Sequence, residues 1–164
     1  MARTREDYLL KPTDRLADTL TAHAPGRERD WAENIEGAIG GLEQALRQHC
    51  SATEAPDGMF TDVDLTRPTL VRQVNELRQE HCQLLEQARE LQRQVRNALQ
   101  AFQSSPAQNG EPNPLPAAMP AVTVPDFGAI RQDGEKLVAA LKHHHEEETK
   151  LVLESVSTDI GGGD

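Results

Sequence analysis

The sequence predicts an all-α fold: an up-down helical bundle of three long helices plus a short N-terminal helix. Good helix formers, above all Leu, Ala, Glu, Gln and Arg, dominate the chain. Aromatic residues make up only 3% of it, and β-branched residues form no alternating runs, so a sheet core would be difficult to assemble. Apolar residues recur instead at steps of three and four, the spacing that places them on one face of a helix.

The length of 164 residues is that of one domain. We predict a loose polar N-terminus over residues 1–12, a single helical bundle over 13–158 and a polar tail over 159–164. Inside the bundle, six prolines with Asn, Gly and Ser over residues 103–125 indicate an extended linker. The short helix is expected over residues 14–23.

The three long helices are predicted from their start and stop signals. The first should begin near Asp30, a candidate N-cap residue, and end before Pro56-Asp57-Gly58. The second should begin around Thr66, with Pro68 in its first turn, and the third directly after Asp126. The clearest signal is the heptad seam of the second long helix, formed by Leu70, Val74, Leu77, His81, Leu84, Ala88, Leu91, Val95, Ala98 and Phe102.

Each long helix carries one histidine in step with its apolar stripe. Glu148 follows the histidine of the third helix by four residues, so the two side chains project side by side. Glu54 could turn inward where the first long helix ends. Imidazole and carboxylate together suit iron, zinc or manganese rather than calcium, and bundle cores commonly hold such sites. The candidate metal ligands are therefore His49, Glu54, His81, His144 and Glu148.

The heights of these histidines along the bundle give a first geometric expectation. If the second and third helices are antiparallel, His81 and His144 lie within roughly 6 Å of the same level, at a rise of ~1.5 Å per residue. His49 reaches that level only if the loop over residues 55–65 supplies an offset. Cys50 and Cys82 each follow a seam histidine and point about 100° away from it, so we expect small apolar filler rather than ligands.

A metal-free alternative stays open. A polar residue on a seam can fix the register of the helices, as a buried Asn does in coiled coils. The protein would then be a helical interaction or scaffold protein. The seam over residues 70–102 is about 50 Å long, longer than we expect the other helices to cover, which favours a homodimer through this helix.

The charge balance excludes some classes of partner. With 17 basic and 27 acidic side chains, the formal net charge is −10, which disfavours nucleic acid and anionic membranes. Apolar runs stay below the ~20 residues of a membrane span, and the first residues do not resemble a secretory signal. We therefore expect a cytoplasmic protein. Because the sequence contains no recognisable nucleophile or phosphate-loop motif, an enzyme is not predicted.

The ligand spacing also carries a family resemblance. The segments His49-Cys-Ser-Ala-Thr-Glu54, Glu80-His81 and His144-x-x-x-Glu148 resemble small bacterial hemerythrin-like (HHE cation-binding) proteins. The resemblance covers residues 28–164 without the linker. It implies a four-helix bundle that binds non-haem iron for oxygen, nitric oxide or iron handling, and we expect sensing, storage or buffering rather than substrate turnover.

The chain departs from the full di-iron pattern of that family, which includes an H-x-x-x-H pair on one helix. The positions four residues to either side of His81 are Leu77 and Leu85, and a further ligand would have to come from His23 in the short helix. The resemblance therefore implies a single-metal or metal-free relative rather than a reversible oxygen carrier.

Overall fold

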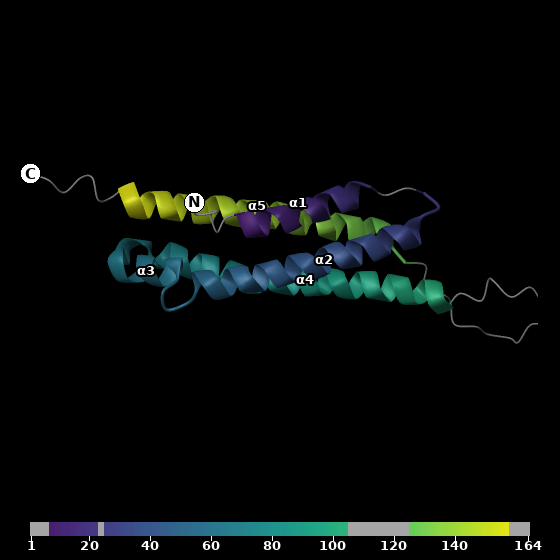
Figure 1. Cartoon of the computed structure of the whole chain (residues 1–164), viewed down its shortest axis with the longest axis horizontal. Helices are drawn as coiled ribbons and strands as arrows, with labels where there is room; N and C mark the ends of the chain where they lie inside the picture. Colours follow the sequence, from purple (N-terminus) through teal and green to yellow (C-terminus); the bar gives the residue numbers. More distant parts are fainter. Residues whose placement is uncertain (1–6, 23–24, 105–124, 158–164) are drawn as a thin grey trace, which may run out of the picture.

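The computed structural model describes residues 7–22, 25–104 and 125–157, which form an elongated helical bundle (Figure 1). Its four principal helices are α1 (Asp7–Thr21), α2 (Glu28–Thr53), α4 (Val71–Ser104) and α5 (Phe127–Ser157). Helices α1 and α4 run in one direction and α2 and α5 in the other (Figure 1). Because α1 and α4 each pack against both α2 and α5, every neighbour is antiparallel. The all-α prediction is confirmed, since the described residues contain no strand.

The N-terminal helix begins earlier than the sequence predicted. Residues 7–12 belong to α1, so the expected loose N-terminus is wrong for them. Leu9 and Thr13 extend the buried face that Leu16 and Leu20 form, and the Thr13 hydroxyl donates a hydrogen bond to the Leu9 carbonyl at 2.8 Å. Burial of this face against α2 and α5 outweighs the helix-breaking tendency of Pro12, which lies inside α1.

The connection between α2 and α4 holds two short elements that the sequence analysis missed. Helix α3 (Met59–Thr66) is followed by a 3₁₀ turn, η1 (Pro68–Leu70), and α4 starts only at Val71. The predicted start at Thr66 is wrong because a residue before proline is disfavoured in the helical conformation. Arg67 indeed has φ −133° and ψ 77°, which separates the two segments.

The predicted helix caps have different outcomes. Asp126 is confirmed as the cap of α5, because its Oδ1 accepts a hydrogen bond from the Ala129 backbone N–H at 2.9 Å. Asp30 is not a cap, since α2 begins at Glu28 and Asp30 lies in its first turn. Gln103 and Ser104, predicted as linker, end α4. The rest of the linker up to residue 124 and the tail over 159–164 lie outside the described residues.

The heptad seam of α4 is confirmed. Its positions from Val74 to Ala98 are all buried, and only Leu70 and Phe102 at its two ends are partly exposed. The expectation that the other helices would leave the seam uncovered is wrong, because α2 and α5, with 26 and 31 residues, cover it together with α3. A homodimer stays a prediction, and it would have to use another face.

A polar layer divides the core into two parts. The larger apolar cluster fills the bundle among α1, α2, α4 and α5, and a smaller one consists of Phe60, Val63, Val74, Leu77 and Leu151. His81 lies between Leu77 of the smaller cluster and Leu84 of the larger one, and on α5 His144 and Glu148 lie between Leu141 and Leu151. Among the residues that the structure describes, all the buried ionisable side chains but Glu43 belong to this layer.

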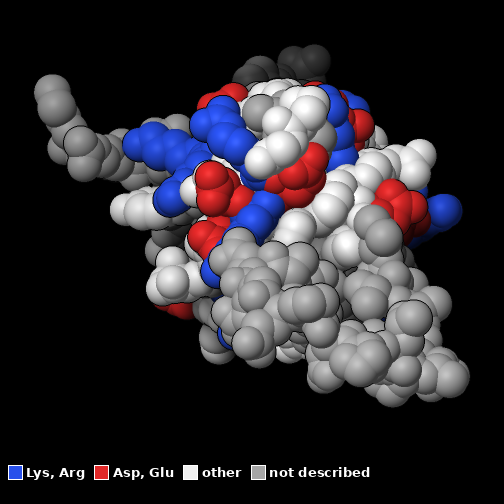
Figure 2. All heavy atoms as spheres, turned by 90° about the vertical axis from the view of Figure 1, so that its right-hand side faces the viewer, with Lys and Arg blue, Asp and Glu red and all other residues white. Residues whose placement is uncertain are grey.

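Charges of both signs share the surface. At the end of the bundle where α2 begins and α4 ends, acidic and basic side chains lie side by side (Figure 2). Ion pairs also join α2 to α4, with Arg96 3.0 Å from Glu36 and Arg89 3.3 Å from Glu43. Within the described ranges, the structure contains no helix with the length and apolar character of a membrane span.

Candidate metal centre

Three helices bring their seam histidines to one point. The ring centroids of His81 and His144 are 4.7 Å apart, and His49 lies 5.3 Å from His81 and 6.0 Å from His144. The first two side chains are 1% exposed and the His49 side chain is 14% exposed. His49 reaches the level of the other two histidines because α3 and η1 lengthen the connection from α2 to α4 and so shift the two helices along the bundle axis.

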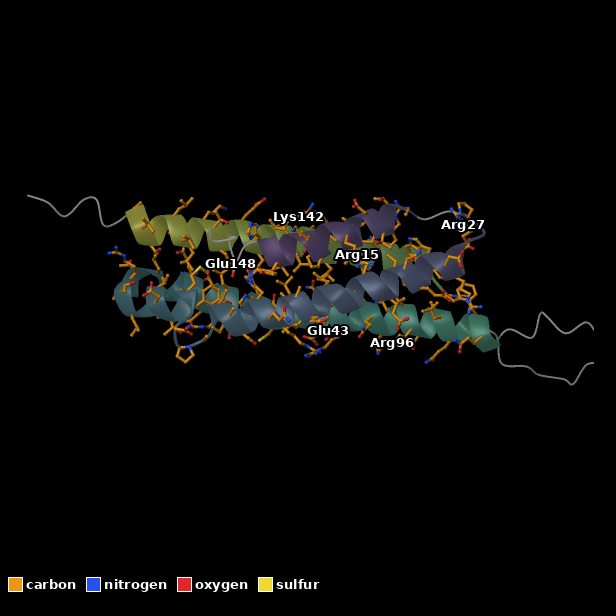
Figure 3. The ribbon with its side chains drawn as sticks, in the orientation of Figure 1. Arg15, Arg27, Glu43, Arg96, Lys142 and Glu148 are labelled. Carbon is orange, nitrogen blue, oxygen red and sulfur yellow. The ribbon has the colours of Figure 1, made fainter. Side chains whose placement is uncertain are left out.

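Glu148 completes the group from α5, and Figure 3 shows it directed into the bundle. Its Oε1 is 2.9 Å from Nε2 of His49, a hydrogen-bond distance. The same oxygen is 3.5 Å from Nε2 of His144 and 3.7 Å from Nε2 of His81, which is too long for a good hydrogen bond. One ligand atom from each of the four residues therefore faces a common centre, all within 4.8 Å of one another.

Two further carboxylates hold the outer nitrogens of the buried histidines. Nδ1 of His81 is 2.5 Å from Oε1 of Glu54, and Nδ1 of His144 is 2.8 Å from Oε2 of Glu80. An ionised carboxylate only accepts hydrogen bonds, so each Nδ1 carries the proton and donates it. In the neutral ring, Nε2 then presents a lone pair to the centre. This carboxylate–histidine arrangement is the one that orients imidazole ligands in metal sites.

The two inner nitrogens lack a partner in the described structure. Nε2 of His81 and Nε2 of His144 are both buried and form no hydrogen bond. Buried polar atoms almost always find a partner, and a buried atom left without one costs about 1–3 kcal/mol. Two such atoms beside one carboxylate indicate a site for a cation.

The electrostatics of the layer favour the same conclusion. Burial by itself would raise the pKa of Glu148, but the nearby imidazoles of His144, His49 and His81 lower it well below its usual range, so the carboxylate stays ionised. Burial would also lower the pKa of His144, yet Glu148 and Glu80 together raise it. The layer therefore attracts positive charge, which a proton or a metal ion can supply.

The separations of the donor atoms fit one transition-metal ion. A tetrahedral ion with bonds of about 2.0–2.1 Å holds neighbouring ligand atoms about 3.3–3.4 Å apart. Glu148 Oε1 lies between 2.9 and 3.7 Å from the three Nε2 atoms, and all four ligand atoms lie within 4.8 Å of one another, so the side chains would have to draw together to form the polyhedron.

Aromatic packing closes the centre toward α3. Phe60 is fully buried and stacks on the His81 ring at 5.4 Å between centroids, with 20° between the planes. The Arg78 guanidinium lies 5.8 Å from the centre of the Phe60 ring and pairs with Asp64 at 2.7 Å. This packing fixes the ring plane of His81.

Glu80 and Phe60 also belong to the site, although neither was among the ligands predicted from the sequence. Glu80 directly precedes a seam histidine, and this Glu-His dipeptide is the signal that could have placed a carboxylate on the flank of the seam. Phe60 carried no such signal, because α3 was not predicted. Glu54, a predicted ligand, lies on the outer nitrogen of His81. His23 lies outside the described residues.

The two cysteines differ in their surroundings. Cys82 is exposed, so the prediction that it fills the core is wrong. Cys50 is partly buried, packs against the larger apolar cluster, and lies near Glu54 and His81. Burial and the nearby Glu54 charge raise the pKa of the Cys50 thiol to about 12. The packing of Cys50 against the apolar cluster agrees with the expected role of core filler.

No protein-family model, curated protein sequence or solved structure matches the chain.

Proposed function

We propose that the protein binds one transition-metal ion through His49, His81, His144 and Glu148, as a hemerythrin-like non-haem iron protein that senses, stores or buffers its ion. The observation that carries the proposal is the pair of buried Nε2 atoms without partners. A bound ion would accept both lone pairs and compensate the charge of the Glu148 carboxylate.

The donor set supports iron, manganese or zinc. Three imidazoles and one carboxylate suit these borderline ions, whereas calcium requires six to eight oxygen ligands. Among the three ions, the resemblance to hemerythrin-like proteins favours iron. A single ion fits best, because the other ligand group in the described residues, Cys50, Glu54 and His81, shares His81 with the first.

The location of the ligands supports a sensing or buffering role. His49, His81 and His144 come from α2, α4 and α5, and the short helix α1 contributes no described ligand. An ion at this point would tie three helices together, and its binding energy would add to the stability of the folded bundle. Ion occupancy would thereby control the order of one level of the bundle.

The test is metal analysis of the untagged full chain after loading with Fe(II), Mn(II) or Zn(II) and removal of free metal. We expect one ion per chain in the wild type and a loss of binding in His144→Gln and Glu148→Gln. The matched control is His143→Gln, at the exposed neighbouring position, which should bind as the wild type does. A wild type that retains none of the three ions would refute the proposal.

The register-fixing alternative predicts a different result. If the polar layer only aligns the helices, metal leaves the melting temperature of the protein unchanged. Under the proposal, a saturating ion raises the melting temperature of the wild type but not that of Glu148→Gln.

A further inference from the structure

A pocket of about 390 Å³ lies beside the candidate metal centre. His49 and Glu148 form part of its wall, whereas His81 and His144 do not line it. Four helices supply its apolar or partly apolar walls: α1 with Tyr8 and Leu9, α2 with Ala45 and Ala52, α3 with Met59, and α5 with Val152.

The pocket lies beside the first described turn of α1. Helix α1 has 15 residues, whereas α2 and α5 have 26 and 31. Its first turn, with Tyr8 and Leu9, lines one side of the pocket, and Met59 of α3 lines another. Between these two elements, no helix of the described residues covers the groove that α2 and α5 form, as the start of α1 near the middle of the bundle illustrates (Figure 1). This uncovered part of the groove lies at the same height along the bundle as the polar layer, since His49 and Glu148 line the pocket.

The pocket meets the centre at its accessible edge. The His49 and Glu148 side chains are 14% and 8% exposed, while the His81 and His144 side chains are 1% exposed. An ion held by four protein ligands can take a fifth or sixth, as iron and zinc do in open sites. The position left for an added ligand is therefore on the side that His49 and Glu148 share with the pocket.

We propose that this pocket binds a small organic molecule with an uncharged apolar body and one nitrogen or oxygen donor that coordinates the ion. This inference rests on the proposed function. The volume is within the range of small-molecule sites, about 300–1,000 Å³. The lining contains no Lys or Arg; besides His49, only the imidazole of His145 could carry positive charge there, and the Glu148 carboxylate would repel an anionic body. Gln48, Thr53 and Thr149 add a few polar groups that can orient the molecule.

The chemistry of the lining distinguishes this occupant from the start of the chain. Residues 1–6, Met-Ala-Arg-Thr-Arg-Glu, carry two arginines and a glutamate. These charged side chains do not match the apolar walls, whereas an aromatic or aliphatic body does.

The experiment uses the full chain loaded with Co(II), whose visible absorption spectrum reports its coordination. Imidazole and 4-phenylimidazole are titrated as probes, since both offer the same donor and only the second has an apolar body. We expect 4-phenylimidazole to bind at least about tenfold more tightly, because its phenyl ring leaves water for the pocket. Ala45→Leu, which fills the pocket, should abolish this preference and leave imidazole binding in place. Ala139→Leu, at an exposed position of α5 outside the pocket, is the matched control.

The outcomes separate the two proposals. Failure of the chain to bind Co(II), Fe(II), Mn(II) or Zn(II) overturns the metal site itself. Co(II) binding with equal affinity for the two probes overturns the pocket assignment alone. A preference for 4-phenylimidazole that survives Ala45→Leu also overturns it, because the phenyl ring must then bind elsewhere.

Discussion

Replacement of Glu80 by glutamine tests whether the outer carboxylates orient the histidines for metal. Glu80 accepts a hydrogen bond from Nδ1 of His144 at 2.8 Å, while Nε2 of the same ring faces the centre without a partner. Glutamine has the same shape and can still accept the bond, but it lacks the charge that strengthens the hydrogen bond and makes Nε2 a better donor to a metal. We expect Glu80→Gln to weaken metal binding by about 10- to 100-fold.

This loss corresponds to about 1.4–2.7 kcal/mol of binding free energy. The stability of the metal-free fold should change by less than about 1 kcal/mol, because the Glu80 side chain is 35% exposed and solvent screens its pairing. The matched control is Glu76→Gln, one turn earlier on α4, where the carboxylate is 55% exposed and pairs with Arg72. Its metal affinity should equal that of the wild type.

The affinities are measured by competition with a chromophoric chelator, and thermal unfolding of the metal-free proteins shows whether each variant folds. A folded Glu80→Gln that binds metal as tightly as the wild type would refute the orienting role. Equal weakening in Glu76→Gln would attribute the effect to the general charge of α4 instead. Glu54→Gln should act on His81 in the same way.

Three further predictions concern stability. Gly134→Ala should destabilise the fold by about 1–3 kcal/mol in denaturant unfolding, because its Cβ would lie 2.6 Å from Cδ2 of Leu20. Gly37→Ala, with open space around it, should stabilise α2 by about 0.5–1 kcal/mol; equal effects would contradict the close approach of α1 and α5. An ion at a concentration of a hundred times its Kd stabilises the folded state by about 2.7 kcal/mol. Its removal should therefore lower Tm by about 5–11 °C in a thermal melt. The pKa of Glu148 is lowered from 4.5, so the ionised carboxylate stabilises the fold above pH 4.5, and this stabilisation is lost as the pH falls below 4.5. The pKa of His144 is raised from 6.5, so the protonated ring stabilises the fold below pH 6.5, and this stabilisation is lost as the pH rises through the raised pKa. The metal-free protein should therefore have its highest Tm between pH 4.5 and 6.5, and a Tm that rises steadily into alkaline pH would contradict this.

Long periodic segments were the part of the fold that could be predicted from sequence. The seam from Val74 to Ala98 repeats often enough to define both the helix and its buried face. Helix α3 has eight residues and buries only Phe60 and Val63, which is too few for a period to be recognised. The start of α1 was missed for a related reason. Leu9 and Thr13 alone form no recognisable period, and their burial follows only from packing against other helices.

The candidate site could be predicted in its residue types but not in its atomic contacts. The step of three or four residues placed His49, His81 and His144 on buried faces, and the structure brings them together. Which nitrogen of each ring meets which carboxylate depends on the rotation and height of whole helices. For this reason Glu54 was grouped with the ligands, whereas its carboxylate lies on Nδ1 of His81.

The short α1 and the polar layer together predict where the metal-free protein opens first. At the level of the layer, α2 and α5 lack the cover of α1 and are held by few apolar contacts, because histidines and Glu148 occupy the core positions there. A bound ion would replace the missing contacts. Without it, amide hydrogen exchange should accelerate over residues 46–53 and 144–152, and the amides of residues 88–98 in the larger apolar cluster should keep their protection. Exchange that accelerates evenly along α4 as well would show that the ion stabilises the bundle only as a whole.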